Sequence, residues 1–163
     1  MRVLVTGIPG SGKSTLAAAL ADALGWRLVS KDAIKVALWD TFGPGDRRWS
    51  YRLGRASIAA LQSLVASAEE PIVVDNFVGA TFEDEWSFPN AVEVHCICPP
   101  ELARQRYVER IRNECHFDTE QVENFDGWVA NDAARAPLGP RLDVDTSVVV
   151  DVAAVVEWLT RGR

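Results

Sequence analysis

The feature that most constrains this chain is a glycine-rich stretch near its N-terminus, GIPGSGKS at residues 7–14. It matches the pattern G-x-x-x-x-G-K-[S/T] at every fixed position. A short apolar run at residues 3–5 precedes it, and Gly25 provides a helix stop farther on. Between them, apolar residues recur at helical spacing: Leu16, Leu20, Ala23 and Leu24. A buried strand, a tight glycine turn and a helix, in that order, predict the start of a parallel α/β sheet.

The chemistry of such a loop is specific. Glycines let successive backbone N–H groups turn toward one centre, where the following helix adds unpaired N–H groups and the positive end of its dipole. This geometry binds phosphate, while Lys13 adds a full positive charge and the Ser14 hydroxyl is placed to ligate Mg²⁺. We therefore expect a nucleoside triphosphate to contact this set of residues: Gly7, Pro9, Gly10, Ser11, Gly12, Lys13, Ser14 and Thr15. A glycine-rich turn without a ligand is the alternative.

Composition narrows the class of protein. A chain of 163 residues with 48% apolar and 25% charged residues suits one globular domain over residues 1–163. No apolar run reaches the roughly 20 residues of a membrane span, and the N-terminus leaves no room for a signal peptide before the first strand. The three cysteines give no disulfide framework, so we expect a cytoplasmic protein with reduced thiols. A net charge of −6 disfavours a general nucleic-acid binder.

Short apolar runs alternate with longer amphipathic stretches along the rest of the chain. Further strands are expected near residues 26–29, 72–75, 92–98 and 141–146. Further helices are expected around residues 34–38, 48–68, 101–113, 120–134 and 152–159. This alternation predicts a three-layer α/β fold with a parallel five-stranded sheet. Ligands are then expected at the carboxyl ends of the strands.

Two carboxylates follow expected strands at that edge. Asp32 comes just after the second strand and is our candidate for the base that accepts the proton of an acceptor hydroxyl. Capping of the next helix is the alternative role for this residue. Asp75 ends the third strand in the Walker B form, so we expect it to reach Mg²⁺ together with Ser14. Asn76 follows it instead of a glutamate, which disfavours ATPases that activate water and fits a kinase.

A basic run, RQRYVERIR at residues 104–112, follows the fourth expected strand. In a helix, Arg106 and Arg110 lie four residues apart and share a face. Guanidinium groups on such a face can fold over a triphosphate and stabilise the charge of a transferring phosphoryl group. We expect a lid segment at residues 101–120. A solvated helix whose arginines pair with neighbouring glutamates is the alternative.

Taken together, the chain resembles the small P-loop kinases grouped with the polynucleotide 5′-kinase domain, chloramphenicol phosphotransferase and the zeta-toxin kinases. Only the glycine-rich segment is specific alone, but the matching segments are collinear and span nearly the whole chain. They are VTGIPGSGKST (5–15), LVSKDAIK (28–35), IVVDN (72–76), ELARQRYVER (101–110) and LDVDTS (142–147).

The resemblance implies a nucleoside-monophosphate-kinase-like fold with strand order 2-3-1-4-5. The catalytic residues expected on this basis are Asp32, Lys13, Arg106 and Arg110. Lys35 corresponds to a basic position that contacts the acceptor in the polynucleotide kinase, and Asp75 to an acidic position near the acceptor. We accordingly expect the acceptor beside Asp32, Lys35 and Asn76.

The predicted function is a Mg²⁺–ATP-dependent kinase that transfers the γ-phosphoryl group to a hydroxyl of a small molecule. A nucleic-acid 5′-hydroxyl kinase and a nucleotide-dependent switch are the alternatives. The acidic cluster Glu83-Asp84-Glu85 disfavours a polynucleotide acceptor, and the lack of an N-K-x-D motif favours ATP over GTP. The identity of the acceptor and the oligomeric state are not predicted.

Two groups of residues are set aside. The histidines and cysteines match no usual zinc spacing, so no metal site is assigned to His95, Cys96, Cys98, Cys115 and His116. Four aromatic residues lie in segments that line the acceptor side in relatives and could either stack on an acceptor or belong to the core: Trp39, Trp49, Tyr51 and Trp86.

Overall fold

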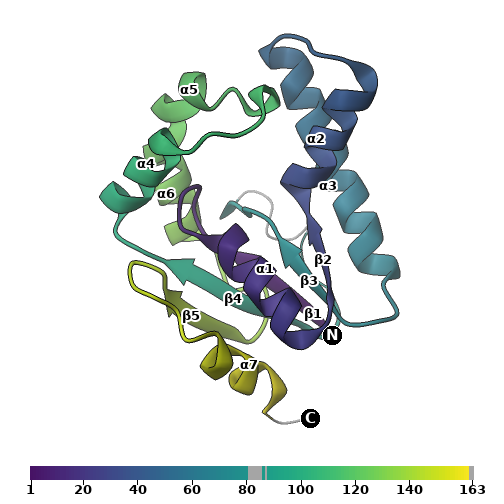
Figure 1. The fold of residues 1–163 in the computed structure, drawn as a ribbon, viewed down its shortest axis with the longest axis vertical. Coiled ribbons are helices and arrows are strands. Elements are labelled where there is room, and N and C mark those ends of the chain that lie inside the picture. The colour runs from purple at the N-terminus through teal and green to yellow at the C-terminus, as the bar shows by residue number, and fades with distance from the viewer. Residues whose placement is uncertain (81–85, 87, 162–163) are drawn as a thin grey trace.

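A computed structural model describes residues 1–80, 86 and 88–161 (Figure 1). Within them, five strands form one parallel sheet in the order β2-β3-β1-β4-β5, so the predicted fold class and strand order are confirmed. The acidic cluster at residues 83–85 lies outside the described residues. The strands are β1 (Arg2–Thr6), β2 (Arg27–Ser30), β3 (Ile72–Asp75), β4 (Ala91–Ile97) and β5 (Arg141–Asp145).

The register of the strands brings polar residues together at the carboxyl edge of the sheet. Val5 of β1 pairs with Asp75 of β3, and Ser30 of β2 pairs with the same residue from the other side. On the opposite flank of β1, Thr6 pairs with His95 of β4. The glycine-rich loop leaves β1 at this edge, as predicted.

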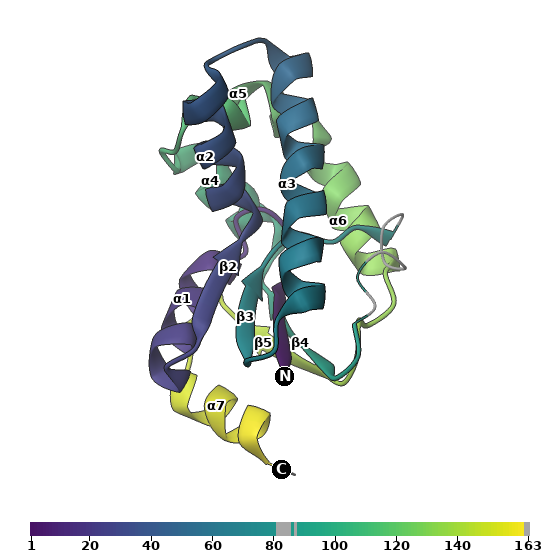
Figure 2. The same ribbon diagram turned by 90° about the vertical axis from the view of Figure 1, so that its right-hand side faces the viewer.

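Helices cover both faces of the sheet (Figures 1 and 2). On one face, α1 (Lys13–Leu24) and α7 (Val152–Thr160) bury apolar residues against alternate positions of β1 and β4. On the other face, the long helix α3 (Arg47–Ser67) buries Leu61 and Val65 against Leu4 and Val74. The predicted apolar stripes of α3 and α7 are therefore confirmed, and so is that of α1 at Leu16, Leu20 and Leu24, whereas its fourth predicted member, Ala23, is exposed.

A second helix, α6 (Phe125–Ala134), covers the same face as α3 near β4. Behind it lies a buried polar cluster, in which Arg135 forms an ion pair with Glu93 of β4 although both side chains are 0% exposed. The Thr6 hydroxyl donates to Glu93 at 2.5 Å, and the Leu138 N–H donates to the other carboxylate oxygen at 2.9 Å. Hydrogen bonds thus satisfy a charge that burial alone would make costly.

Helices α2 (Lys31–Phe42) and α3 pack against each other and extend past the carboxyl edge of the sheet (Figure 1). The four aromatic residues for which the sequence allows either an acceptor contact or a core position differ in their burial. Trp39 and Trp86 are buried in apolar clusters, Trp49 packs beside the Trp39 cluster, and Tyr51 is 68% exposed. Core packing therefore accounts for three of the four.

The lid segment differs from its predicted helix. Helix α4 covers Pro100–Glu109 and ends before Arg110, which has extended backbone angles (φ −70°, ψ 142°). The expected helix at 101–113 is therefore wrong at its C-terminal end. The reason is that Arg110 and Arg112 both pair with Asp118, which a continuing helix would not allow across this short interval.

Short elements then replace the start of the helix expected at 120–134. They are a 3₁₀ turn η2 (Glu114–His116), a one-turn helix α5 (Asp118–Gln121) and a second 3₁₀ turn η3 (Val122–Asn124). Phe117 between them has a left-handed backbone (φ 49°), which interrupts any continuous helix. The predicted stripe survives, because Phe125 is buried and Val122 and Val129 pack against it.

Candidate active site

The glycine-rich loop has the backbone that its sequence predicts. Gly7, Gly10 and Gly12 have φ angles of 134°, 85° and 86°, a region that residues with a Cβ rarely adopt. A Cβ at Gly7 would lie 2.6 Å from the carbonyl oxygen of Cys96, and one at Gly10 would overlap the carbonyl oxygen of Ala103. Glycine is therefore required by local packing as well as by the turn.

The loop residues carry the charge and hydroxyl groups predicted to meet a nucleotide. Lys13 begins α1, and its Nζ lies 3.5 Å from the carbonyl oxygen of Ile8, so the side chain folds back across the loop. Burial lowers the pKa of Lys13, and the negative charges of Asp75 and Asp32 oppose that effect. Ser14 and Thr15 are exposed on the first turn of the same helix. The Lys13 ammonium group thus lies against the loop, and the side chains of Ser14 and Thr15 are exposed next to it in the sequence.

Three buried polar atoms beside this loop have no hydrogen-bond partner among the described residues: Ser11 Oγ, Asp75 Oδ1 and Asn76 Nδ2. The other oxygen of Asp75, Oδ2, accepts a hydrogen bond from the Ser30 hydroxyl at 3.1 Å, which fixes the carboxylate at the end of β3. Buried polar groups are normally paired, so orphans gathered at one place point to a ligand. The free carboxylate oxygen of Asp75 is the kind of ligand that Mg²⁺ prefers, whereas Asn76 Nδ2 can only donate a hydrogen bond to a bound group.

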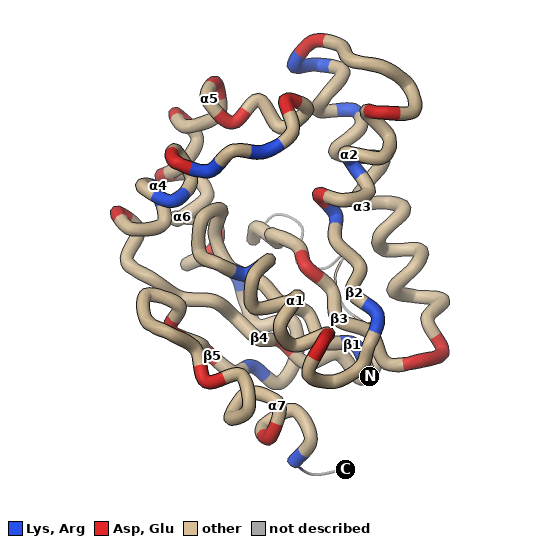
Figure 3. The backbone as a smooth tube through the Cα atoms, viewed as in Figure 1, with Lys and Arg blue, Asp and Glu red and all other residues tan. Residues whose placement is uncertain are grey.

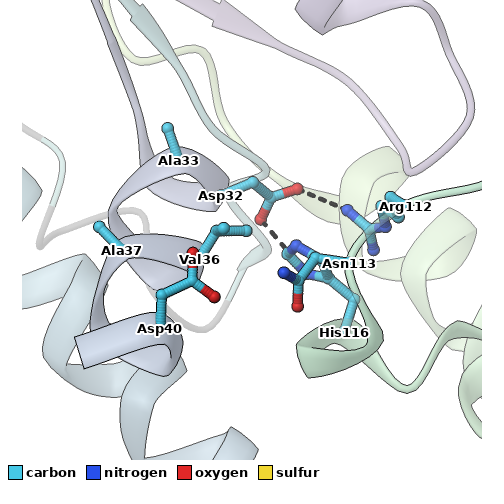
Figure 4. A pocket seen from close by; sticks show the side chains of 8 residues that line it. All are labelled: Asp32, Ala33, Val36, Ala37, Asp40, Arg112, Asn113 and His116. Atoms are coloured by element: carbon cyan, nitrogen blue, oxygen red, sulfur yellow. Dashed lines mark hydrogen bonds and ion pairs between the residues drawn. The ribbon is translucent and has the colours of Figure 1, made fainter. Parts of the chain in front are cut away.

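Asp32 lies on the first turn of α2 and is held by cations from two elements (Figure 4). Its Oδ2 accepts from Arg112 Nη1 at 2.6 Å, and its Oδ1 accepts from Lys31 Nζ at 3.1 Å. His116 Nδ1 lies 3.9 Å from the same Oδ1. Burial alone would raise the pKa of Asp32, but the charges of Lys31 and Arg112, and that of His116 at the acid pH where it is protonated, hold it well below its usual range. The carboxylate is therefore ionised at every physiological pH.

A pocket of about 470 Å³ opens between α2 and the lid segment, with Asp32 in its wall. One side is a single face of α2, with the small or apolar residues Ala33, Val36 and Ala37 between two carboxylates. The lid segment supplies the opposite side. The lining residues are Asp32, Ala33, Val36, Ala37, Asp40, Arg112, Asn113 and His116 (Figure 4). A volume of this size is in the range of small-molecule sites.

Lys35, predicted to contact the acceptor, is buried below the surface of the pocket. Its Nζ donates to the Ser50 hydroxyl at 2.8 Å, and this hydroxyl donates to the carbonyl oxygen of Cys115 at 2.6 Å. Burial lowers the pKa of Lys35 to about 8. The chain of hydrogen bonds joins α2, α3 and the lid segment, and Lys35 does not line the pocket.

The two arginines expected to share a lid face diverge. Arg106, inside α4, donates from Nη1 to the carbonyl oxygen of Thr146 at 3.1 Å. Arg110, just past the helix, lies over the Tyr107 ring at 4.1 Å and forms an ion pair with Asp118 at 3.3 Å. Lys and Arg positions nevertheless follow one another along α4 and the segment after it (Figure 3). Of the two arginines, Arg110 acts electrostatically on Lys13 of the loop.

Three site residues were not found from the sequence: Arg112, His116 and Asp118. Arg112 belongs to the basic run, but a continuous helix would have pointed it away from Arg106 and Arg110. His116 was considered only as a metal ligand. It is buried, and desolvation lowers its pKa to about 4, so it is neutral at physiological pH. The sequence offered one signal for the role of Asp118: it is an acidic residue that follows an arginine-rich run, with which it could form ion pairs.

Among the described residues, no group of three or more histidine, cysteine, aspartate or glutamate side chains is arranged to hold a metal ion. No helix in this part of the chain is both long and apolar enough to cross a bilayer.

Comparisons with known proteins agree with this architecture. A kinase candidate from Chloroflexus aurantiacus J-10-fl is 26% identical, with 99% of this chain and 97% of that chain covered and a TM-score of 0.77. A sugar kinase from Janibacter sp. HTCC2649 is 19% identical over 99% and 95% of the chains, with a TM-score of 0.68. Shikimate kinase from Bacteroides thetaiotaomicron is 18% identical over 98% and 96%, with a TM-score of 0.63.

No curated protein matches the chain. A family model described as an AAA domain matches residues 3–126, which is more than half of the sequence. The chain therefore belongs to the AAA domain family and has the fold of the P-loop kinases.

Proposed function

We propose that this protein is a Mg²⁺–ATP-dependent kinase that transfers the γ-phosphoryl group to a hydroxyl of a small molecule. One observation carries the proposal. A phosphate loop bordered by the orphaned buried atoms of Ser11, Asp75 and Asn76 lies near a pocket of about 470 Å³ that has the carboxylate of Asp32 in its wall. The negative charges of Asp32 and Asp75 both act on Lys13, which supports the proposal that the loop and the pocket belong to one site.

Each residue has a role in this reaction. The loop N–H groups and Lys13 hold the triphosphate, and Ser14 with Asp75 would hold Mg²⁺, which neutralises phosphate charge when bound. An acceptor hydroxyl in the pocket donates a hydrogen bond to Asp32 as its oxygen forms a bond to the γ-phosphorus. The bond from that phosphorus to the β-phosphate oxygen breaks, ADP leaves, and the hydroxyl proton passes to Asp32 and then to water. Arg106 and Arg110 stabilise the charge on the transferring group.

The named neighbours favour a small acceptor. The structures similar to this chain include a sugar kinase, a gluconokinase and shikimate kinases, whose names denote small hydroxylated acceptors. The pocket and the net charge of −6 point in the same direction. A polynucleotide would need a basic track for its phosphates.

A screen of small hydroxylated metabolites with γ-³²P-labelled ATP tests the proposal. We expect label in at least one acceptor, and Asp32→Asn is expected to lower the transfer rate by about 10²–10⁴-fold, the usual range for a general base. Asp143→Asn, which removes an exposed carboxylate of β5, is the matched control.

Three results would contradict the proposal. Transfer that survives in Asp32→Asn would remove the base assignment. Labelling of an oligonucleotide 5′-end that falls steeply between roughly 50 and 200 mM salt would favour the nucleic-acid kinase. Nucleotide binding without transfer to any acceptor would favour a nucleotide-dependent switch.

A further inference from the structure

We propose that Arg112 is a positioning residue for Asp32: it bridges the lid segment to the carboxylate and orients it to accept the hydrogen bond of the acceptor hydroxyl. This inference rests on the proposed kinase function. It assigns a role to a residue that lies outside the phosphate loop and outside the pair of arginines expected to meet the triphosphate.

The geometry of the guanidinium group is the first argument. Arg112 Nε and Nη2 donate to the two oxygens of Asp118, the latter at 2.5 Å, while Nη1 donates to Asp32 Oδ2 at 2.6 Å. One planar group thus joins two carboxylates that lie 86 residues apart in the sequence, on α5 and α2. Lysine has no such fork and cannot make this set of bonds.

The rigidity of the anchor is the second argument. Asp118 also accepts from the Tyr107 hydroxyl at 2.9 Å and from Arg110 Nη2 at 3.3 Å. Burial alone would raise the pKa of Asp118, but the hydrogen bond from Arg112 and the charges of Arg112 and Arg110 lower it to about 2. Asp118 therefore stays charged and holds the guanidinium in place before any ligand arrives.

The other groups that face Asp32 do not replace this bridge. Lys31 is its neighbour in the sequence and reaches only Oδ1, and neutral His116 lies 3.9 Å from the same oxygen. Arg112 is the group that holds Oδ2. The titratable and charged groups around Asp32 are Lys31, Lys35 and Asp40 on α2, Lys13 at the loop, and Arg112, Cys115 and His116 in the lid segment.

The bridge changes how Asp32 works. A carboxylate paired with Arg112 and Lys31 is a weak base, so it orients the hydroxyl at the start of the reaction and does not remove its proton then. The proton becomes acidic as the oxygen bonds to phosphorus, which fits the loose transition state of phosphoryl transfer. Asp32 accepts the proton at that stage and releases it to water. A base with a pKa near neutrality is not required.

The first experiment needs no substrate. The Asp32 carboxyl carbon is followed by ¹³C NMR during an acid titration of the nucleotide-free protein, with Asp32→Asn to assign the signal. In the wild type we expect it to stay ionised below the range of an ordinary aspartate. In Arg112→Ala we expect titration nearer the ordinary value of about 4. Arg112→Gln is the second variant if Arg112→Ala does not fold. Arg104→Ala, which removes an arginine of α4 paired with exposed Asp126, is the control.

An unchanged Asp32 titration in both Arg112 variants would contradict the proposed bridge, whether or not the protein is a kinase.

The second experiment uses the acceptor found in the screen. We expect Arg112→Ala to lower kcat about 10- to 100-fold with an unchanged KM for ATP, and to introduce an acid limb in the kcat–pH profile. A raised KM for the acceptor with kcat preserved would instead make Arg112 an acceptor-binding group. Absence of transfer in the wild type would defeat the kinase proposal while the titration still decides the bridge.

Discussion

Lys13 is the single side chain on which nucleotide binding should depend most. Lys13→Ala is expected to weaken Mg²⁺–ATP binding at least tenfold, because a charge-assisted contact to phosphate contributes about 1.5–3 kcal/mol. Isothermal titration calorimetry measures the change, and Arg161→Ala, just past the end of the far helix α7, is the control for a lost surface charge. Equal affinity in Lys13→Ala and the wild type would show that the loop does not bind the triphosphate.

At the residue scale, prediction from the sequence was best where chemistry depends on the local pattern. The turns at Gly7, Gly10 and Gly12 follow from the motif, because each needs a backbone that only glycine adopts readily. The burial of Lys35 did not follow, since its partner Ser50 lies on a different helix. The spacing of residues along one helix does not predict which residue of another helix a side chain contacts.

The segment after α4 is the element whose structure depends on a single carboxylate. Asp118 accepts hydrogen bonds from Tyr107, Arg110 and Arg112. Asp118→Asn is expected to free residues 110–121, which we would measure as faster amide hydrogen exchange there, with exchange in α1 unchanged. If Asp118→Asn changed the exchange rate by the same factor at residues 110–121 and in α1, Asp118 would not be the residue that holds this segment.

The acid sensitivity of this element follows from the same residue. Because the folded-state pKa of Asp118 is lowered to about 2 from an ordinary value of 3.8, its contribution to stability is complete above the ordinary value. This contribution is lost as the pH falls from there through about 2.

The prediction of a helix over residues 101–113 was wrong at its C-terminal end for a physical reason. Ion pairs to Asp118, a later residue, outweighed the weak helix propensity of three or four residues.

Stability of the whole molecule should depend strongly on the buried ion pair behind α6. Removing Arg135 leaves Glu93 charged and unpaired in the core, so Arg135→Ala is expected to cost about 3–5 kcal/mol of unfolding free energy. Urea denaturation measures it, and Arg141→Ala, which breaks the pair with half-exposed Asp143, should cost much less. The double variant Glu93→Leu with Arg135→Met should recover stability relative to Arg135→Ala. Similar losses from Arg135→Ala and Arg141→Ala would contradict this account.

At the same scale, strand order and layers were predicted correctly because parallel sheets leave a clear pattern of apolar runs. The polar cluster around Glu93 was missed for the opposite reason. The alternation of residues along β4 predicts that Glu93 faces outward. Its partner Arg135 lies beyond the end of α6, where no helical spacing relates it to the strand.

Gly10 and the carbonyl group of Ala103 meet backbone against backbone, with no room for a Cβ between them. Such close packing couples the position of the phosphate loop to that of the first turn of α4. A hinge of the lid segment is then expected farther along, at the non-helical residues 110–113, whose backbone is not fixed by helical hydrogen bonds. Rotation there would have to break the ion pair between Arg112 and Asp32, and it would carry His116 away from α2 while the loop keeps its place. The acceptor and its phosphorylated product could then enter and leave while the nucleotide remains in place.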